Sequence, residues 1–332
     1  NVNTCTYSLF PITCMGMPEL PEVETTVRGL KQKVVGRTII DVWSDLPRKN
    51  VSLPHFTNTI KSQKFFDAFQ KKVTGKKIKG VTRRAKNILI ELSSDDTILV
   101  HMKMTGHLLF GEYTKEQAKG ERHEAGATWI PSKNERNEAL RDPFNRFVHF
   151  VLVLDHGKHL VLSDTRKFAK VTLINKEDIE NEFAHLGPEP LEKKFDLKKF
   201  KSQLMKKPSG KIKQVLLDQT IISGIGNIYS DEMLWLAGIH PEEKIENITE
   251  GKMKLLFSGM KDVLAKGIDF GGDSMSDYRD IDGKKGNFQH HHNAYRRKGE
   301  ACGKRGCKGV ILRKVVAGRS SHYCSIHQKL TK

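Results

Sequence analysis

Four residues near the end of the chain constrain its fold more than any other feature. Four residues separate Cys302 from Cys307, sixteen separate Cys307 from Cys324, and two separate Cys324 from His327. Two close-spaced pairs suit a tetrahedral Zn²⁺ site, because soft thiolates and imidazole can converge on one ion. So small a terminal unit has little core, and the metal would supply much of its folding energy. The pattern predicts one structural Zn²⁺, because four protein ligands leave no open position; the alternative is a set of unpaired thiols.

The charge of the chain indicates a polyanionic partner. The 332 residues carry a net charge of +18. Ten basic residues and one acid lie between Lys61 and Lys86, and thirteen basic residues and one acid lie from Gly283 to Lys332. Two separated basic blocks suit a protein that grips a nucleic-acid backbone from two sides, although each block could instead be a solvated face.

Two further features restrict the class of protein. No apolar run reaches the roughly 18 residues that a membrane-spanning helix needs, so we expect no membrane association. Cys5 and Cys14 lie near the start, and the long middle of the chain has no cysteine. We therefore expect no disulfide scaffold, and we expect the protein to lie in a reducing compartment such as the cytoplasm.

The chain divides into a β-rich part and a helical part. Val23, Val27, Leu30 and Val34 have helical spacing, and the segments that follow are short and β-rich. A segment with two prolines, 186–194, predicts a hinge, and the pattern beyond it is helical. The expected strands are 38–43, 87–92, 97–102, 146–154 and 159–162, and the expected helices beyond the hinge are 196–206, 211–219, 228–237 and 250–265.

A glycine-containing turn between two of these helices predicts an anion site. Gly224 and Gly226 allow a tight backbone turn, and the start of the next helix offers free N–H groups to an anion. Asn227 is placed to donate to a phosphodiester. The alternative is an ordinary turn between helices, which is the more common role of such a motif.

The sequence Met17-Pro18-Glu19 predicts a nucleophile. Removal of Met17 would leave a free prolyl amine, whose pKa of about 8 leaves it partly neutral and able to attack carbon. Residues 1–16 lack the features of a secretory signal, and residue 1 is not Met. We therefore expect residues 1–16 to be a leader outside the mature chain, with Met17 as the initiator; the alternative is that these residues are made and then removed by proteolysis. The alternative is that Pro18 merely precedes a helix.

Six motifs, in order, resemble those of the formamidopyrimidine-DNA glycosylase family of the Fpg/Nei superfamily. The resemblance covers nearly everything from Met17 onward. The motifs are Met17–Glu24 (MPELPEVE), Arg83–Lys86 (RRAK), Asp164–Phe168 (DTRKF), Leu186–Leu191 (LGPEPL), Gly224–Tyr229 (GIGNIY) and Arg297–Cys302 (RKGEAC).

The resemblance implies an α+β fold in four parts with DNA in the cleft between the two main domains. It implies a catalytic β-sandwich domain flanked by helices over 17–185, with an exposed insertion at about 111–145. A hinge over 186–194 leads to a helix–two-turn–helix domain over 195–294, which includes a lesion-capping loop at 271–278. A zinc finger follows over 295–332.

The resemblance also implies the roles of single residues. Pro18 is the nucleophile, Glu19 the general acid and base, and Lys86 a catalytic and phosphate-binding residue. Glu22 and Glu232 support the site, and Met104, Arg166 and Phe168 fill the gap left by the extruded base. The remaining DNA contacts are assigned to Lys213, Asn227, Tyr229 and Arg319.

The implied activity is that of a bifunctional DNA glycosylase and AP lyase. Such an enzyme removes oxidised purines from damaged duplex DNA through an iminium, as a monomer and without a small-molecule cofactor. Two alternatives remain: a Nei-type glycosylase for oxidised pyrimidines, and a catalytically silent zinc-dependent DNA-binding protein. The family finger usually carries four cysteines in two Cys-x2-Cys pairs. Here the first spacing is longer and His327 stands last, with His322 as a competitor for the fourth position.

Overall fold

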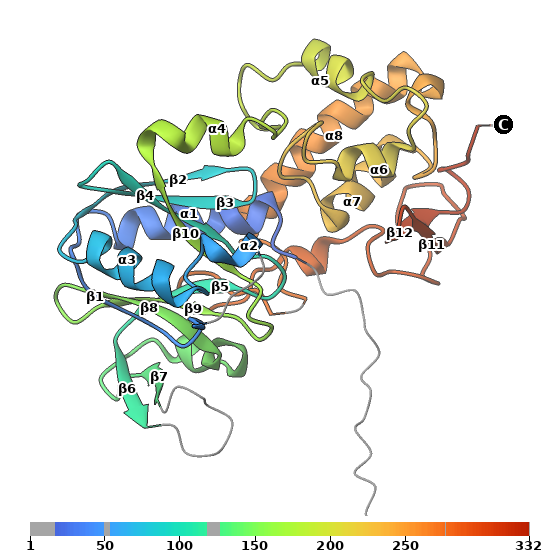
Figure 1. Ribbon diagram of the computed structural model, residues 1–332. Helices are drawn as coiled ribbons and strands as arrows, with labels where there is room; N and C mark the ends of the chain where they lie inside the picture. The colour runs from blue at the N-terminus through green and yellow to red at the C-terminus, as the bar shows by residue number, and fades with distance from the viewer. Residues whose placement is uncertain (1–16, 50–53, 118–126, 276, 332) are drawn as a thin grey trace, which may run out of the picture.

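The structure is a computed structural model that describes residues 17–49, 54–117, 127–275 and 277–331. The expected leader, residues 1–16, lies outside the described residues. A two-sheet sandwich with its helices forms one end of the molecule, and a helical group with a small hairpin forms the other (Figure 1).

Two four-stranded antiparallel sheets form the sandwich. One sheet has the order β1-β8-β9-β5 and the other has the order β10-β4-β3-β2. Their inward side chains form one core between the sheets, because apolar residues recur along β3, β4, β8 and β9. The bounds are β1 (Ile39–Ser44), β2 (Ile78–Arg84), β3 (Asn87–Leu92), β4 (Asp96–His101), β5 (His107–Gly111), β8 (Val148–Leu154), β9 (His159–Ser163) and β10 (Lys170–Asn175).

Helix α1 (Leu20–Lys33) contributes its expected apolar stripe to this core. Val23, Val27 and Leu30 are buried there, and Pro21 lies in the first turn, where its missing N–H costs nothing. Helix α3 (Gln63–Val73) covers another part, with Phe69 in edge contact with Phe150 of β8. The short helices α2 (Pro54–Thr57) and α4 (Ile179–Phe183) lie at the borders of this domain.

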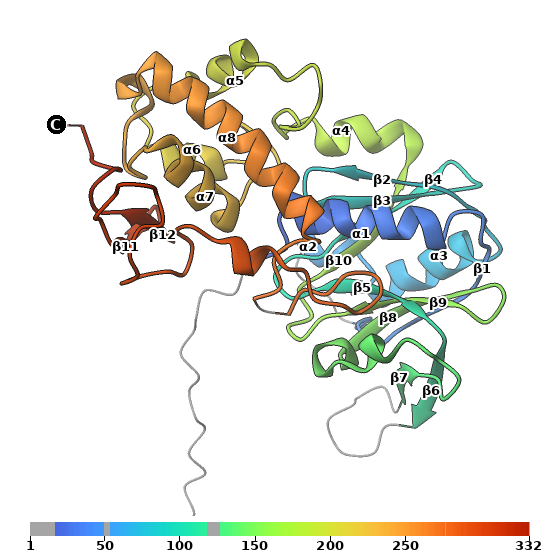
Figure 2. The same cartoon turned by 180° about the vertical axis from the view of Figure 1, so that it is seen from behind.

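The helical domain has a second core of its own. Helices α7 and α8 pack against each other, and the far end of α8 reaches α1 (Figure 2). Asp196 caps α5 by accepting a hydrogen bond from Lys199 N, as a residue of its type does at a helix start. The bounds are α5 (Leu197–Leu204), α6 (Ile212–Leu217), α7 (Asn227–Ala237) and α8 (Glu250–Asp269), and the 3₁₀ turns are 138–141, 143–146, 176–178, 245–247 and 288–291.

The chain ends in a β-hairpin that packs on α7. Strands β11 (Ile311–Val316) and β12 (Arg319–Cys324) are joined by Ala317 and Gly318, which both have positive φ values, as a type I′ turn requires. Trp235 of α7 packs with Ile311 in a small shared core.

The insertion has more structure than its polar sequence suggests. Strands β6 (Tyr113–Gln117) and β7 (Ala127–Pro131) pair with each other, and residues 118–126 lie outside the described residues. Trp129 and Leu140 are buried against Val151 and Val161, on the outer face of the β1-β8-β9-β5 sheet. Part of the segment therefore covers a sheet rather than projecting into solvent.

Candidate active site

The start of α1 is tied to the loop that precedes α7. Pro18 and Glu19 are buried, and Leu20 N donates to Gly224 O at 3.0 Å. Gly224 has a φ of +87°, and a Cβ there would lie 2.6 Å from Leu20, so only glycine fits this approach. The turn of the GIGNIY motif thus positions the residues that follow Met17.

The carboxyl group of Glu19 lies at the N-terminus of α7. Its Oε1 accepts a hydrogen bond from Ile228 N at 2.9 Å. A Cβ on Gly226 would lie 2.3 Å from Glu19 Cδ, which explains the second glycine of the motif. The sequence pattern predicts a phosphate at this end of α7. In the structure the carboxyl group of Glu19 lies there instead, and it accepts from backbone N–H groups that a phosphate would also use.

Burial makes Glu19 a candidate proton carrier. Desolvation raises the pKa of Glu19 above the ordinary value of a glutamate, and the nearby charge of Lys86 opposes that rise. Burial lowers the pKa of Lys86 in turn, and the charges of Glu19 and Glu22 oppose that change. A carboxylic acid whose pKa is raised can give and take a proton nearer to neutral pH.

Glu22 joins three parts of the chain. Its Oε2 accepts from Glu19 N at 2.8 Å, and its Oε1 accepts from Tyr229 Oη at 2.6 Å and from Asp273 N at 2.7 Å. Burial, with the neighbouring charge of Glu19, raises the pKa of Glu22 to about 8. Glu22 thus links the start of α1 to Tyr229 of α7 and to Asp273, and the sequence does not indicate the contact with Asp273.

A cavity of about 420 Å³ lies beside Glu19. Lys86, Asn227 and Arg319 also line it, from the β2–β3 turn, the start of α7 and the β11–β12 hairpin. The side-chain oxygen and nitrogen of Asn227 are buried and have no hydrogen-bond partner among the described residues. The structure thus brings together residues that are far apart in the sequence and leaves an amide free to bind a ligand.

Two predicted DNA contacts take different positions. The side chain of Lys213 is 0% exposed, and its Nζ donates to Asn227 O, Ser230 Oγ and Asp231 Oδ1. Tyr229 is also 0% exposed, with its hydroxyl directed at Glu22. The assignment of these two side chains as direct DNA contacts is therefore corrected, because both are held inside the protein, where they support Asn227 and Glu22.

Asp231 is a further supporting residue that the sequence analysis misses. It is 0% exposed, and its carboxylate accepts from Lys213, from Ser321 Oγ at 2.8 Å and from His322 N at 2.9 Å. The next residue, Glu232, accepts from the backbone N–H groups of residues 293–295. These adjacent acids attach α7 to the C-terminal unit. The resemblance already assigns a supporting role to Glu232, whereas Asp231 is indicated only by its place beside Glu232 in the helix that begins in the GIGNIY motif.

The three predicted gap-filling residues lie together at the surface. Arg166 Nη1 is 3.3 Å from the sulfur of Met104, and the guanidinium of Arg166 lies 4.5 Å from the ring centroid of Phe168. Phe168 is 47% exposed, which is unusual for a large apolar ring. A partly exposed apolar pair with a guanidinium suits insertion into a base stack.

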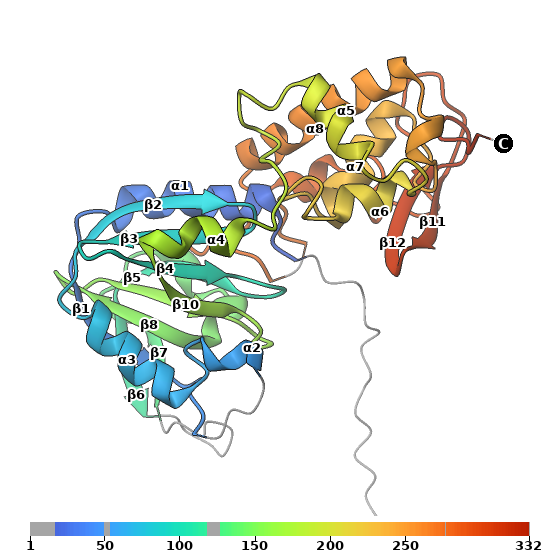
Figure 3. The same ribbon diagram turned by 45° about the horizontal axis from the view of Figure 1, so that its top comes forward.

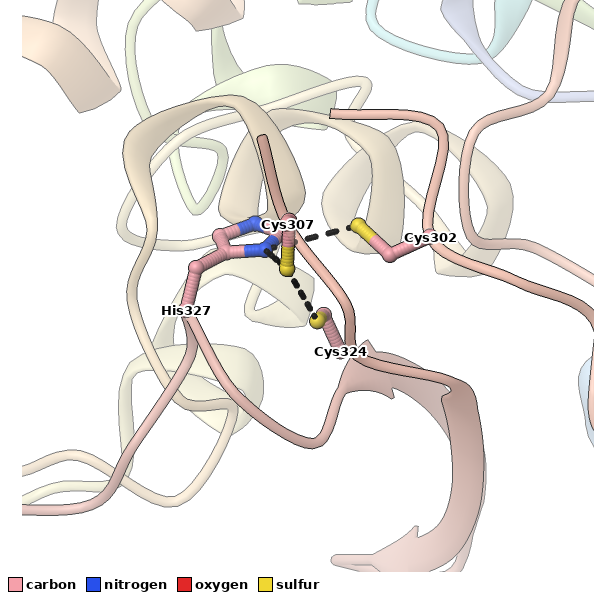
Figure 4. A group of neighbouring side chains, drawn as sticks. All are labelled: Cys302, Cys307, Cys324 and His327. Atoms are coloured by element: carbon pink, nitrogen blue, oxygen red, sulfur yellow. Dashed lines mark hydrogen bonds between the residues drawn. The ribbon is translucent and has the colours of Figure 1, made fainter. Parts of the chain in front are cut away.

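The predicted metal ligands converge at the C-terminus (Figure 4). One ligand atom from each of the four side chains lies within 4.8 Å of the others. Cys302 Sγ and Cys307 Sγ lie 3.5 and 3.7 Å from His327 Nδ1, and Cys307 Sγ lies 3.5 Å from Cys324 Sγ. Tetrahedral Zn²⁺ separates such ligand atoms by roughly 3.6–3.8 Å, so the donor set fits this ion.

The contacts of two histidines distinguish the fourth ligand from its competitor. His327 Nε2 lies 3.1 Å from Trp235 O, which leaves Nδ1 free to face a metal. His322 Nδ1 lies 3.0 Å from Asp231 Oδ2, and His322 is absent from the four-residue cluster. The geometry therefore favours His327.

Comparison with known proteins assigns the family. A model described as the formamidopyrimidine-DNA glycosylase N-terminal domain matches residues 17–171, and one described as the formamidopyrimidine-DNA glycosylase H2TH domain matches residues 186–279. The chain belongs to the formamidopyrimidine-DNA glycosylase family. The family match thus begins at the residue before the candidate nucleophile.

Relatives in this family match almost the whole chain. The formamidopyrimidine-DNA glycosylase of Herpetosiphon aurantiacus is 36% identical over 312 residues, which cover 94% of this chain and 100% of the relative. The corresponding protein of Heliobacterium modesticaldum is also 36% identical, with the same coverage.

Solved structures of the family have the same fold. Wild-type Lactococcus lactis Fpg (MutM), in complex with DNA that contains N7-benzyl-Fapy-dG, is 31% identical and has a TM-score of 0.74. MutM in complex with DNA that contains carbocyclic 8-oxo-G is 31% identical and has a TM-score of 0.75. Each comparison covers 94% of this chain and 100% of the other. Within the described part of this family member, no helix has both the length and the apolar character needed to cross a bilayer.

Proposed function

We propose that this member of the formamidopyrimidine-DNA glycosylase family removes oxidised purines from duplex DNA and then cuts the strand, with the amine of Pro18 as its nucleophile. Family membership makes the chain a DNA glycosylase of base excision repair. The observation that carries the finer proposal is the cavity beside Glu19, because Lys86, Asn227 and Arg319 line it next to the start of α1. A cation, an amide and a guanidinium around one space suit the phosphates on either side of a damaged nucleoside.

The chemistry follows from a secondary amine next to a buried acid. The Pro18 nitrogen forms a bond with the anomeric carbon of the deoxyribose, and the bond from that carbon to the base breaks. Glu19, whose pKa burial raises, gives a proton to the ring oxygen and assists ring opening. The resulting iminium withdraws electrons, so that β-elimination and then δ-elimination release the two phosphates. The product is a one-nucleotide gap with phosphate at both ends.

Two observations support oxidised purines as the substrates. By resemblance to the family, the Arg166-Lys167-Phe168 arrangement after Asp164 favours the purine-specific branch over the Nei branch. The related structures were solved with DNA that contains a formamidopyrimidine or an 8-oxoguanine analogue. The lesion must leave the base stack before the sugar can reach Pro18, and an apolar wedge offsets part of that cost.

The active form requires an unblocked nitrogen at Pro18, because an amide nitrogen has no nucleophilic lone pair. We therefore propose that the working enzyme begins at Pro18. It binds damaged duplex DNA as a monomer, and Cys302, Cys307, Cys324 and His327 hold one structural Zn²⁺. When bound, the ion supplies cross-linking that holds the β11–β12 hairpin, and with it Arg319, against α7. Light scattering of the purified protein, alone and with DNA, tests the monomer.

Borohydride trapping tests the proposed chemistry. Two forms are compared, one that begins at Pro18 and one that retains residues 1–17. Each is mixed with duplexes that carry 8-oxoguanine, thymine glycol or no lesion, and borohydride reduces any iminium to a stable adduct. We expect an adduct only from the first form, and mainly with 8-oxoguanine.

Each other outcome has a defined meaning. An adduct mainly with thymine glycol would indicate a Nei-type enzyme. If neither form gives an adduct but both still bind DNA, the remaining alternative is the catalytically silent DNA-binding protein. An adduct from the form that retains residues 1–17, with its intact mass confirmed, would show that the Pro18 amine is not the nucleophile.

A further inference from the structure

The three gap-filling residues lie on two crossover loops that the topology places side by side. Residues 102–106 lead from β4 in one sheet to β5 in the other, and residues 164–169 lead from β9 back to β10. His101 of β4 pairs with Lys170 of β10, and His107 of β5 pairs with Ser163 of β9. Both loops therefore cross between the two sheets at the same end of the sandwich. In Figure 3, β4 ends on the side that faces the helical domain.

Both loops have backbone conformations that need external support. Lys103 has a φ of +58° and Lys167 has a φ of +56°. Residues other than glycine rarely adopt this left-handed conformation, and it persists where surrounding contacts hold it. Each of these lysines is the immediate neighbour of a gap-filling residue, so the contacts that hold the lysines also set the direction of Met104, Arg166 and Phe168.

The contacts that hold the second loop converge on Asp164. Asp164 is 1% exposed, and its Oδ2 accepts from Ala169 N at 2.7 Å while its Oδ1 accepts from Arg166 N at 3.2 Å. Its backbone carbonyl accepts from Lys167 N at 3.2 Å. A single buried carboxylate therefore closes the loop from 164 to 169 around the gap-filling residues it carries.

Thr105 connects this carboxylate to the first loop. Thr105 is 1% exposed, and its hydroxyl donates to Asp164 Oδ1. The hydroxyl oxygen, Thr105 Oγ1, also accepts a hydrogen bond from Arg166 N at 3.2 Å. The next residue, Gly106, has no space for a side chain, because a Cβ would lie 3.1 Å from Ala169 and 2.6 Å from Met102 O. The two loops are thus hydrogen-bonded and closely packed one residue away from Met104.

We propose that Thr105 and Asp164 are positioning residues that make Met104, Arg166 and Phe168 one preorganised wedge. The role of the wedge itself rests on the proposed function. Neither positioning residue is accessible to DNA, since both are buried, so they act through the direction and rigidity of the three side chains. Preorganisation matters because a wedge that is ordered only on binding loses part of its stacking energy to conformational entropy.

Wedge insertion can be measured without catalysis. The protein is mixed rapidly with a duplex that contains a stable abasic analogue next to 2-aminopurine, whose fluorescence rises as it unstacks. We expect Thr105→Val to slow this rise by about tenfold, the typical effect of losing one buried hydrogen bond. Thr105→Ser retains the hydroxyl and is expected to keep the rate, whereas Asp164→Asn is expected to slow it, because an amide cannot accept on both of its atoms.

Thr172→Val is the matched control. Thr172 is a buried threonine of β10 whose hydroxyl donates to Asn58 O, away from both loops. We expect this change to lower thermal stability about as much as Thr105→Val does, and to leave the fluorescence rate unchanged. Equal slowing by Thr172→Val and Thr105→Val would show a general loss of stability and overturn the positioning role.

Two other results bear on the proposal separately from the function. A Thr105→Val rate within twofold of the original would overturn the inference, even if the enzyme excises 8-oxoguanine. A wild-type protein that unstacks 2-aminopurine but forms no borohydride adduct would overturn the proposed function, and the dependence on Thr105 would still test the wedge.

Discussion

Glu22 Oε2 accepts a hydrogen bond from the backbone N–H of Glu19 at a distance of 2.8 Å. This contact fixes the peptide that joins Pro18 to Glu19, and so it sets the direction of the ring nitrogen that is proposed to attack DNA. The other oxygen of Glu22 accepts from Asp273 N, in the predicted lesion-capping loop. One carboxyl group therefore connects the proposed nucleophile with the segment expected to lie over the damaged base.

The protonation of Glu22 predicts a pH dependence of stability. Its folded-state pKa is about 8, against 4.5 for an ordinary glutamate. The folded protein holds this proton more tightly than the unfolded chain does. The contribution of Glu22 to the free energy of unfolding is therefore complete below pH 4.5 and is lost as the pH rises towards 8. The melting temperature should fall over this range, and Glu22→Gln should flatten that part of the curve.

Scanning calorimetry between pH 4.5 and 9 measures this difference. Glu250→Gln is the control, because Glu250 is exposed and its pKa is lowered by Lys201 rather than raised. Parallel melting curves for the wild type and Glu22→Gln would contradict the prediction.

The contact between Gly226 and Glu19 predicts a selective loss of activity. In Gly226→Ala, the new Cβ would lie 2.3 Å from Glu19 Cδ, so the carboxyl must leave the N-terminus of α7. Since removal of a positioned proton carrier costs about 10²–10⁴-fold, we expect single-turnover excision to fall by about a hundredfold or more. Excision of 8-oxoguanine from a labelled duplex measures this loss.

Gly251→Ala is the matched control, because a Cβ at Gly251 meets nothing within 4 Å and lies in the first turn of α8. This variant should keep full activity and gain up to about 1 kcal/mol of stability from helix propensity. Full activity in Gly226→Ala would mean that the position of Glu19 does not matter for the chemistry.

The metal site predicts different roles for two histidines. His327→Ala removes one of the four proposed ligands, so the purified protein should contain much less zinc than the wild type and bind DNA more weakly. His322→Ala removes a hydrogen bond to Asp231 and should retain one zinc per chain. Elemental analysis of both proteins measures the metal, and zinc loss from His322→Ala alone would reverse the assignment.

The burial of Lys213 predicts how DNA affinity depends on salt. Each phosphate contact contributes close to one unit to the slope of log affinity against log salt. Arg319→Met should lower that slope by about one unit, because Arg319 is exposed and lines the cavity. Lys213→Met should leave the slope unchanged and destabilise the fold by about 3–5 kcal/mol, the typical cost of breaking a buried ion pair.

Binding titrations at several salt concentrations, together with urea unfolding, separate these two effects. Lys201→Met provides the comparison for stability, because its pair with Glu250 is exposed and should contribute less than about 1 kcal/mol. A slope lowered equally by Lys213→Met and Arg319→Met would show that Lys213 does reach DNA.

Several parts of the fold are predicted correctly from local pattern. The spacing of Val23, Val27 and Leu30 predicts α1, and strand β3 has the expected bounds. Strands β2, β5 and β10 are missed. Strand β2 is an edge strand with the sequence IKGVTRR. Few of its side chains are apolar, so the alternation that predicts a strand is weak. Helix α8 extends beyond the expected Ala265 to Asp269, where tertiary packing continues the last turn.

Short sequence patterns are enough to indicate the chemistry available to this protein. The spacing of Cys302, Cys307, Cys324 and His327 is enough to indicate one metal site, and Met17-Pro18-Glu19 is enough to indicate an amine beside an acid. These features are local, because the residues that make them are neighbours or stand within one small unit.

Which charged and aromatic side chains face outwards depends on how the folded chain packs. The sequence predicts Lys213 to be a surface cation, but the carboxylate of Asp231 pairs with it inside the protein. Asp231 also accepts from the backbone N–H of His322, which lies 91 residues further along the chain. Thr105 and Asp164 lie 59 residues apart and meet only because their strands pair in two sheets. Burial depends on partners that folding brings together, and no local pattern identifies those partners.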